Sequence, residues 1–486
     1  MRRKSGDLSD RERPVSDMLE QYTEKGLSPW HMPGHKRKAV LGGYWDPVFK
    51  RDLTEVSGTD DYHHPEGVIL RSQQQAAEIY GVRYSHYLVG GATAGILAGV
   101  LALTEFRKDR GKERDEAVDT DSPVFLVAGN VHRSVQNALR LVEGEGILLA
   151  PEKDPYYGPV LPETVEAQLN RLKESGKLSG VAGCIITSPT YSGTISPLAE
   201  IHALLEKEGI PLLVDEAHGA HLPFCKALQE YSGIHAGAEL VVQSLHKTLP
   251  ALTQTAIIHV NQPVKEGAGE RMDQLNRILK DKLSVVQSSS PSYILLASAE
   301  EAVVWSDEHR KEFDAFLLRL RVFRDRLREK LNHLELVDHS PVQDPSRIFL
   351  KAPAGLGEWL QRETGVVPEL SGSRELILIS TVMDTEEDLQ HLYEALLMAD
   401  RFVGESEEQP VGQPAGQSVE QAEEQPVDHA DPDTPLPSPG EPVPEDIYVY
   451  PPGVLILKKG DRMTEEARDR IREEQAAGRK VYGCSS

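Results

Sequence analysis

The stretch from Glu239 to Val260, ELVVQSLHKTLPALTQTAIIHV, contains two short apolar runs separated by a polar turn. Apolar runs of this kind, bounded by turn residues, are typical of buried strands. Ser244, His246 and Lys247 follow the first run directly. We therefore expect two neighbouring strands with a lysine near their ends, where bulk water has poor access.

The same pattern extends towards the N-terminus. From residue 87 onward, β-rich runs alternate with helical patterns such as Val131 to Glu143 and Leu198 to Glu208. This alternation predicts an α/β fold with a mostly parallel sheet covered on both faces, in which ligands bind beyond the carboxyl ends of the strands. The predicted strands are YLVGG, PVFLVAG, GCIITS, IPLLVDEA, ELVVQS and TAIIHV.

Two of these strand ends carry ionisable groups. Desolvation would depress the pKa of Lys247, as an imine-forming amine requires, although an isolated lysine more often extends into solvent. Asp215 ends the run IPLLVD, where an ionised carboxylate needs a cation or hydrogen-bond donors. A helix cap or a buried salt bridge would also explain it. His218 and His221, close behind, raise the alternative of a zinc site with Asp215.

Two further strand ends carry other polar signals. The turn Gly91 to Gly95 (GATAG) opens a helix, so its backbone N–H groups are suited to an anion, but close packing explains a glycine turn equally well. His132 follows PVFLVAGN at the start of the next helix. By itself it would be read as a cap or a packed side chain.

Together these groups match what pyridoxal phosphate requires. The lysine would bind the aldehyde, the carboxylate would keep the ring nitrogen protonated, and an imidazole would cover the ring. Hydroxyls, a second imidazole and the glycine turn would hold the phosphate. A metal site explains the histidines but gives no role to the SxHK segment or to the glycine turn.

At these residues the chain resembles the Orn/Lys/Arg decarboxylase family, which has the fold-type-I aminotransferase architecture, and within it the shorter Gram-positive-type members. The likeness runs from residue 31 to about residue 453 in family order and is specific, above all in DEAHGAH followed by SxHKTLPA. The matching segments are HMPGHKRK, LTEVSGTDDYHHPEGVI, NVHRSV, SPTYSGT, LLVDEAHGAHL, VVQSLHKTLPALTQ, QSSSPSYILLAS and YPPG.

The resemblance implies roles for individual residues. Lys247 is similar to the Schiff-base lysine, Asp215 to the partner of the pyridine nitrogen, and His132 to the imidazole stacked on the ring. The residues implied around the phosphate and the other side of the ring are Ser244, His246, Gly91, Ala92, Thr93, Ala217 and His218. Ser288 to Ser290 match a segment that approaches the neighbouring subunit's phosphate in such dimers.

Two positions depart from the family pattern. Ala92 stands where the phosphate turn usually has a hydroxyl residue, so one phosphate contact is expected to be missing. Arg133 stands where lysine is common, which keeps the charge.

The resemblance also implies the reaction. It is α-decarboxylation of arginine, lysine or ornithine to the amine and carbon dioxide, as in polyamine biosynthesis. Lys247 or His132 would return a proton to Cα. Asp60, Asp61 and Glu66, in TDDYHHPEG, are candidates for binding the distal cation of the substrate.

Other functions stay open at this point. An aminotransferase of the same fold would use an arginine such as Arg374 to bind the α-carboxylate. A zinc hydrolase would use His218, His221 and Asp215. A scaffold that has lost its cofactor is the third alternative, with Ala92 as its one support.

Composition narrows the class of protein. The 486 residues carry a net charge of −24, which disfavours nucleic acid and anionic membranes as partners. Three scattered cysteines (Cys184, Cys225 and Cys484) fit a reducing cytosol, and no signal peptide is visible. The uncharged run from Tyr87 to Thr104 is read as a strand, a glycine turn and a buried helix rather than a membrane span.

The chain also divides along its length. Residues 404–443 contain ten Asp or Glu and eight Pro but no Lys or Arg, which predicts a disordered acidic insertion at 404–446. The predicted parts are an N-terminal segment (1–45), a large cofactor-binding domain (46–303), and a smaller α+β domain (304–403 with 447–486). The resemblance implies at least a homodimer.

Overall fold

The computed structural model describes residues 11–38, 41–113, 122–150, 157–262, 269–372, 374–408, 436–445, 447–450, 454–457, 459–476 and 480–483. The chain forms two compact units, Met1–Phe316 and Leu317–Ser486. The division falls inside helix α11 (Arg310–Lys330), beyond the expected boundary at residue 303. Most of the expected acidic insertion lies outside the described residues, but its first five residues, 404–408, continue helix α13 (Glu386–Glu408). Residues 436–445 at its other end are ordered as well, contrary to the expectation, because Val443 is buried in the core beside Met463 and Ile471.

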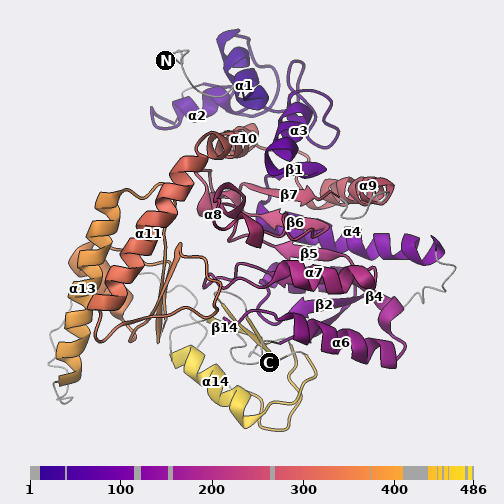
Figure 1. The fold of residues 1–486 in the computed structure, drawn as a ribbon. Helices are drawn as coiled ribbons and strands as arrows, with labels where there is room; N and C mark the ends of the chain where they lie inside the picture. The colour runs from indigo at the N-terminus through magenta and orange to yellow at the C-terminus, as the bar shows by residue number, and fades with distance from the viewer. Residues whose placement is uncertain are drawn as a thin grey trace. The chain divides into compact units, whose positions relative to one another are not determined.

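The first unit is built around a sheet whose described strands follow the order β1-β7-β6-β5-β4-β2-β3 (Figure 1). Neighbours pair in parallel except at β7, which is antiparallel to both β1 and β6. The strands are β1 (Tyr84–Leu88), β2 (Val124–Ala128), β3 (Glu145–Leu149), β4 (Val181–Thr187), β5 (Leu212–Asp215), β6 (Leu240–Gln243) and β7 (Ala256–Val260). The expected α/β class with a mostly parallel sheet is confirmed.

The strand directions decide where the site lies. Because β7 runs against both of its neighbours, β1 points the same way as β6 and the other parallel strands. The carboxyl ends of β1, β2, β4, β5 and β6 therefore meet at one edge of the sheet, together with the amino end of β7. Every residue that the sequence analysis placed after a strand comes to this edge.

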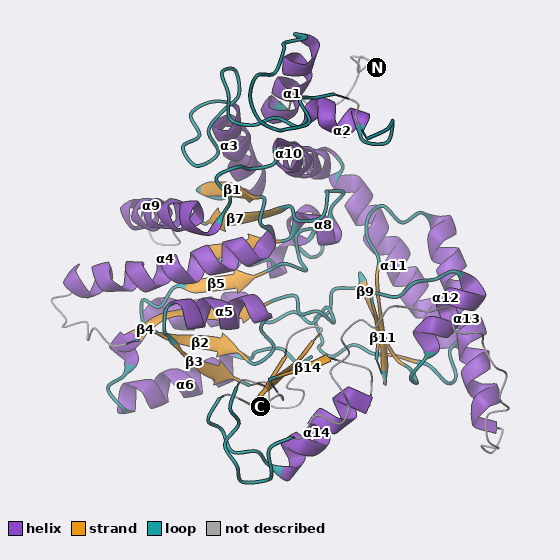
Figure 2. Cartoon of the chain, turned by 180° about the vertical axis from the view of Figure 1, so that it is seen from behind, coloured by secondary structure: helices purple, strands orange, loops and turns teal. Residues whose placement is uncertain are grey.

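Helices cover both faces of the sheet. Figure 2 shows α4 and α5 across one face, and Figure 1, from the opposite side, shows α7 in front of the other. The described α-helices of this unit are α1 (Pro14–Glu24), α2 (Asp46–Arg51), α3 (Val68–Tyr80), α4 (Gly91–Glu113), α5 (Arg133–Leu141), α6 (Pro162–Glu174), α7 (Leu198–Lys207), α8 (Leu245–Thr248), α9 (Gly269–Val286) and α10 (Tyr293–Glu308). Short 3₁₀ turns lie at Leu178–Gly180, Leu222–Phe224 and Gln229–Tyr231.

Helix α4 lies unusually close to the sheet. A Cβ atom added at Gly95 would approach a methyl carbon of Leu88 to 2.7 Å, and one at Gly99 would approach a methyl carbon of Leu213 to 2.5 Å. The uncharged run from Tyr87 to Thr104 is thus the end of β1, a turn and the buried start of α4, as expected. Among the described residues, no helix is long and apolar enough to cross a membrane.

The N-terminal segment is fastened to α10 by a buried carboxylate. Both oxygens of Glu300, whose side chain is fully buried, accept hydrogen bonds from the backbone N–H groups of Val15 and Ser16 at the start of α1. These N–H groups belong to the first turn of the helix, where backbone N–H groups have no hydrogen-bond partners within the helix. Arg13 adds ion pairs to Glu301 and Glu308.

The second unit contains two antiparallel sheets. The four-stranded sheet has the order β10-β11-β9-β8 and the three-stranded sheet the order β13-β12-β14. The strands are β8 (Glu335–Leu336), β9 (Arg347–Lys351), β10 (Leu370–Ser371), β11 (Glu375–Ile379), β12 (Ile447–Tyr450), β13 (Val454–Leu457) and β14 (Lys480–Tyr482), with helices α12 (Leu356–Thr364) and α14 (Glu465–Ala476) besides α13. Val449, Met463 and Ile471 form part of a small core between α14 and its sheet. The expected α+β class of the C-terminal part is confirmed.

Candidate active site

The side chain of Lys247 meets a histidine from the neighbouring strand end. Lys247 lies in α8, the short helix that follows β6 directly, and its amine nitrogen Nζ is 3.0 Å from Nε2 of His218. His218 follows β5 by three residues and is buried, whereas Lys247 is half-buried. The adjacent positions of β5 and β6 in the sheet bring these two side chains together.

Asp215 occupies the last position of β5 and is 3% exposed. Its Oδ1 accepts a hydrogen bond from the backbone N–H of Ala217 at 3.2 Å, which fixes the carboxyl plane. Asp215 and Lys247 both act on the imidazole of His132, the carboxylate favouring its protonated form and the ammonium opposing it. Asp215 and Lys247 therefore lie close enough to His132 for their charges to shift its pKa.

The imidazole of His132 is held by the helix that it begins. It occupies the N-cap of α5, where Nδ1 accepts from the backbone N–H of Ser134 at 3.1 Å and contacts the Ser134 hydroxyl at 2.8 Å. Burial is the largest cause of a lowered pKa for His132, and the charges of Lys247 and Arg133 add to it. The ring is therefore neutral at pH 7 and carries its proton on Nε2. The helix cap considered as an alternative for His132 is present, and the hydrogen bonds that form it involve Nδ1.

Ser244 and His246 lie beside the lysine. Ser244 is 1% exposed and its hydroxyl is 3.4 Å from Nδ1 of His246. Nδ1 of His246 donates to the backbone carbonyl of Thr255 at 2.9 Å, since a carbonyl only accepts. The half-buried His246 ring is thus anchored through one nitrogen to the loop that precedes β7.

The glycine turn between β1 and α4 has the backbone that its sequence suggests. Gly91 has φ +70°, a left-handed conformation that residues with a Cβ rarely adopt. Its N–H donates to the carbonyl of Gln254 at 2.9 Å, and Nε2 of Gln254 donates to the carbonyl of Val89 at 2.7 Å. Ala92 is half-buried and Thr93 is exposed. The first amides of α4 have no partners within the helix, as an anion-binding turn requires.

Several neighbours of these residues carry no functional signal in the sequence. Tyr191 stands edge-on to the His218 ring, with ring centres 5.4 Å apart and an angle of 88° between the planes. Thr187, the register partner of Asp215 on β4, points to the same face of the sheet. Its buried Oγ1 has no hydrogen-bond partner among the described residues. An unsatisfied hydroxyl beside a buried carboxylate is a position at which a polar ligand atom would be stabilised.

Glu216 points away from Asp215 into the protein interior. It is fully buried and accepts from Ser232, from the N–H of Gly233, and from Nε2 of Gln243. Burial raises its pKa to about 7, against the lowering effect of these donors. Because side chains alternate along the chain at the end of β5, one carboxyl of the pair supports the sheet and the other faces the site.

The acidic loop that precedes α3 is organised around Asp60. Its Oδ2 accepts from the backbone N–H groups of Gly67 and Ile69, and its Oδ1 accepts from those of Asp61 and Glu66. Both oxygens of Asp60 thus accept capping hydrogen bonds. Asp60 was a candidate for binding the distal cation of the substrate, but these hydrogen bonds leave its carboxylate no room for that role. Asp61 accepts from two backbone N–H groups, which lowers its pKa, and Asp61 and Glu66 are exposed.

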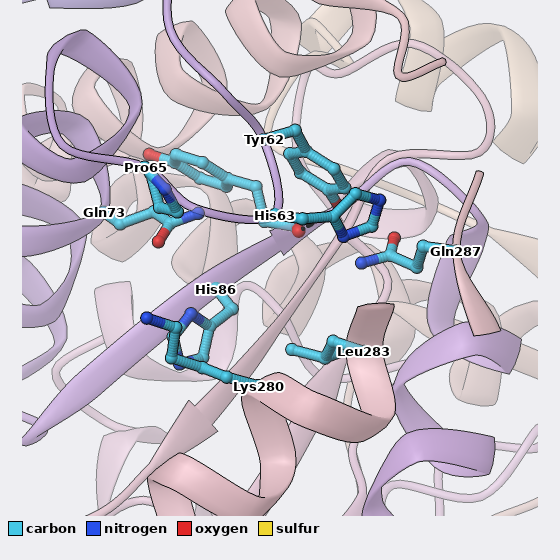
Figure 3. Close-up of a pocket in the computed structure, with 9 residues that line it drawn as sticks. Tyr62, His63, Pro65, Gln73, His86, Lys280, Leu283 and Gln287 are labelled. Atoms are coloured by element: carbon cyan, nitrogen blue, oxygen red, sulfur yellow. Dashed lines mark hydrogen bonds between the residues drawn. The ribbon is translucent and has the colours of Figure 1, made fainter. Parts of the chain in front are cut away.

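The same loop contacts the serine segment. Nε2 of His63 donates to the carbonyl of Ser288 at 3.0 Å, and Ser288 to Ser290 are exposed. Figure 3 shows a cavity lined by His63, Gln287 and Lys280 among others. At about 20 Å³ it has room for a water molecule but not for an amino acid.

The geometry gives the zinc alternative no support. Among the described residues, no group of three or more His, Cys, Asp or Glu side chains is arranged to hold a metal ion. His218 directs Nε2 to Lys247 instead, and His221 is buried at the start of the turn Leu222–Phe224. Arg374, the candidate for an aminotransferase, is exposed in the second unit, next to β11.

Sequence comparison finds one family over most of the chain. The model of the family described as Orn/Lys/Arg decarboxylase, major domain, matches residues 13–354. The uncharacterized protein YaaO of Bacillus subtilis is 29% identical over 94% of this chain and 93% of that protein. An arginine decarboxylase of Halalkalibacterium halodurans is 28% identical over 93% of this chain and 91% of its own length.

Structural comparison finds the same fold. The lysine decarboxylase LdcF of Francisella novicida matches 97% of this chain and 79% of its own, with a TM-score of 0.72 and 16% identity. The serine palmitoyltransferase of Sphingomonas wittichii matches 81% of this chain and 84% of its own, with a TM-score of 0.53 and 17% identity.

Proposed function

The chain belongs to the Orn/Lys/Arg decarboxylase family, and we propose that it removes the α-carboxyl group of a basic amino acid as carbon dioxide with pyridoxal phosphate as cofactor. The observation that carries this proposal is the contact between Lys247 and His218 beside the buried Asp215. An amine, an imidazole and a carboxylate from adjacent strand ends are the groups that the cofactor needs around its ring.

The donor set fits the cofactor. Lys247 would hold its aldehyde carbon, Asp215 would keep its ring nitrogen protonated, and His132 would cover one face of the ring, with Ala217 and His218 on the other. Ser244, His246, Thr93 and the amides after Gly91 would hold its phosphate.

When bound, pyridoxal phosphate supplies an electron-accepting ring for the electron pair left by the departing carboxyl group. The hydroxyl of Thr187, which has no hydrogen-bond partner in the described part of the chain, supports a polar ligand at this place.

The proton that replaces carbon dioxide at Cα would come from Lys247. Its Nζ is 3.0 Å from Nε2 of His218, so the two side chains can exchange a proton directly. His132 is the weaker candidate because its pKa is lowered and its Nδ1 is used as a cap. A neutral imidazole is a poor acid at pH 7.

Arginine is the substrate we propose first among the three basic amino acids. Relatives that match this chain nearly end to end and whose names state a substrate include arginine decarboxylases. Asp61 and Glu66, exposed on the loop that contacts the serine segment, are the proposed acids for the distal guanidinium.

We also propose at least a homodimer, acting in the cytoplasm. Large apolar side chains are exposed between residues 27 and 48, among them Trp30 at 93%, Tyr44 at 82% and Met32 at 64%. Such a cluster is characteristic of an interface. Ser288 to Ser290 would approach the phosphate of the neighbouring subunit.

One assay tests the proposed function. Purified protein with pyridoxal phosphate is incubated separately with arginine, lysine and ornithine, and the amine, carbon dioxide and keto acid are quantified. We expect agmatine and an equal amount of carbon dioxide from arginine, and no keto acid. Keto acid without carbon dioxide would replace this proposal with the aminotransferase, and no product from any of the three would refute it.

A further inference from the structure

Gln254 adopts a backbone conformation that is unfavourable for its residue type. Its φ is +81°, in the left-handed region, where the Cβ of a residue other than glycine is crowded. Gln254 is one of only four described residues besides glycine with positive φ, and it contacts the glycine turn of the candidate site. A conformation of this kind persists only where surrounding contacts stabilise it.

The contacts of Gln254 hold both sides of the glycine turn. Its backbone carbonyl accepts from the N–H of Gly91 at 2.9 Å, and its side-chain Nε2 donates to the carbonyl of Val89 at 2.7 Å. The pairing of β1 with β7 ends at Leu88 and Ala256. Gln254 therefore replaces the next strand partner and fixes the chain on either side of Gly90.

A second glutamine fixes the turn from another direction. The N–H of Val89 donates to Oε1 of Gln287, which is 9% exposed, at 3.1 Å. Figure 3 shows Gln287 at the cavity below His63. The N–H and the carbonyl of Val89 are thus each bound by a glutamine side chain, and these two contacts help to hold the turn just beyond the end of the β1–β7 pairing.

The loop that carries Gln254 also holds the lysine helix. The carbonyl of the next residue, Thr255, accepts from Nδ1 of His246 and from the N–H of Leu245. Two adjacent carbonyls, those of Gln254 and Thr255, therefore bind the glycine turn and α8. This short loop therefore sets the distance between the glycine turn, proposed to hold the phosphate, and the helix whose Lys247 is proposed to hold the aldehyde carbon.

From this arrangement we propose that Gln254 is a positioning residue for the phosphate-binding turn, which it holds in register with Lys247. The inference rests on the proposed function. Gln254 matters more because Ala92 offers no side-chain hydroxyl, so the backbone amides of the turn must bind more of the phosphate. Placing those amides correctly depends on the Val89 and Gly91 contacts.

The test distinguishes binding of the cofactor's phosphate from binding of its ring. The full-length wild type, Gln254→Gly and Thr253→Gly are freed of cofactor and titrated with pyridoxal phosphate and, separately, with pyridoxal, which has no phosphate. Glycine suits φ +81° and keeps the carbonyl for Gly91, but it cannot donate to Val89. Thr253→Gly adds a glycine to the same loop at an exposed position and leaves the Val89 contact intact.

The expected result is selective. Gln254→Gly raises the Kd for pyridoxal phosphate about tenfold, as the loss of one well-placed hydrogen bond predicts. Its affinity for pyridoxal stays at the wild-type value, and its thermal midpoint is no lower than that of Thr253→Gly. An equal loss of affinity for both compounds, or no loss for either, overturns the inference about Gln254. If the wild type binds pyridoxal phosphate, the proposed function still stands in that case. Failure of the wild type to bind pyridoxal phosphate overturns both.

Discussion

The amine nitrogen of Lys247 lies 3.0 Å from Nε2 of His218, so the helix after β6 and the loop after β5 share one direct contact. Tyr191 packs edge-on against the same imidazole. The contact gives the lysine a partner that can both accept and return a proton. It also places the lysine next to the strand end that carries Asp215.

Replacing His218 by phenylalanine should slow turnover and spare cofactor binding. The ring that packs against Tyr191 is kept, but the nitrogen facing Lys247 is lost. We expect kcat to fall about 100-fold to 10,000-fold, the usual range for loss of a proton-transfer partner. Steady-state kinetics with arginine measures the effect, and His391→Phe, at an exposed histidine of α13, is the matched control. An unchanged kcat would show that the contact has no part in turnover.

Thr187→Val should weaken cofactor binding without weakening the fold. The buried hydroxyl has no partner among the described residues, so its removal leaves nothing unsatisfied in the protein without cofactor. We expect an unchanged or higher urea midpoint without cofactor, and a Kd for pyridoxal phosphate raised several-fold. Thr104→Val, whose hydroxyl bonds within α4, is the control. A lower midpoint with an unchanged Kd would assign the hydroxyl to the fold instead.

Ala92→Ser should tighten cofactor binding. Ala92 stands in the turn at the start of α4, where the family usually has a hydroxyl residue, and it is half-buried. A serine there adds one donor to the proposed phosphate site, worth about 1 kcal/mol or a Kd lowered about fivefold. Titration with pyridoxal phosphate measures the change, and pyridoxal should show none. Weaker binding would mean that the turn has no room for the hydroxyl.

Acid should destabilise the first unit through two histidines, the half-buried His86 and the buried His259. Burial lowers the pKa of His86 to about 4 and that of His259 to about 3. At these two side chains the unfolded chain binds more protons than the folded chain below about pH 6.5. Their contribution to stability is therefore complete above that pH and is lost as the pH falls towards about 4. For His86 alone the loss reaches about 3 kcal/mol.

Urea unfolding at several pH values between about 6.5 and 4.5 measures this effect. His86→Gln keeps a donor for the side-chain oxygen of Asn276, to which Nε2 of His86 donates at 2.7 Å, but does not titrate. Its stability should therefore depend less on pH over this interval than that of the wild type. The same slope for both proteins would contradict the assignment.

Local patterns in the sequence predict the sheet and its carboxyl edge, because continuous apolar runs report burial directly. Strand β3 is missed because it lies at the edge of the sheet, where its residues Glu145 and Leu148 are exposed and the run EGILL lacks a continuous apolar pattern. The helix α4 is predictable because its glycines and apolar residues follow one another without a charge.

The supporting residues of the site are not predictable in this way. Gln254 binds Val89, which is 165 positions away, and no local pattern marks a glutamine for that role. The acidic composition of its segment alone makes Asp60 a candidate for binding the substrate. Its carboxylate oxygens instead accept hydrogen bonds from backbone N–H groups up to nine residues later. The roles of Lys247, Asp215 and His132 themselves remain predictions that the cofactor experiments test.

Borohydride reduction of the cofactor-loaded protein, followed by peptide mapping, tests the central claim most directly. The account predicts that the pyridoxyl group is fixed to Lys247 in a single peptide, and that Lys247→Ala carries no label and releases no carbon dioxide from arginine. A label on another lysine, or turnover that persists in Lys247→Ala, would contradict it.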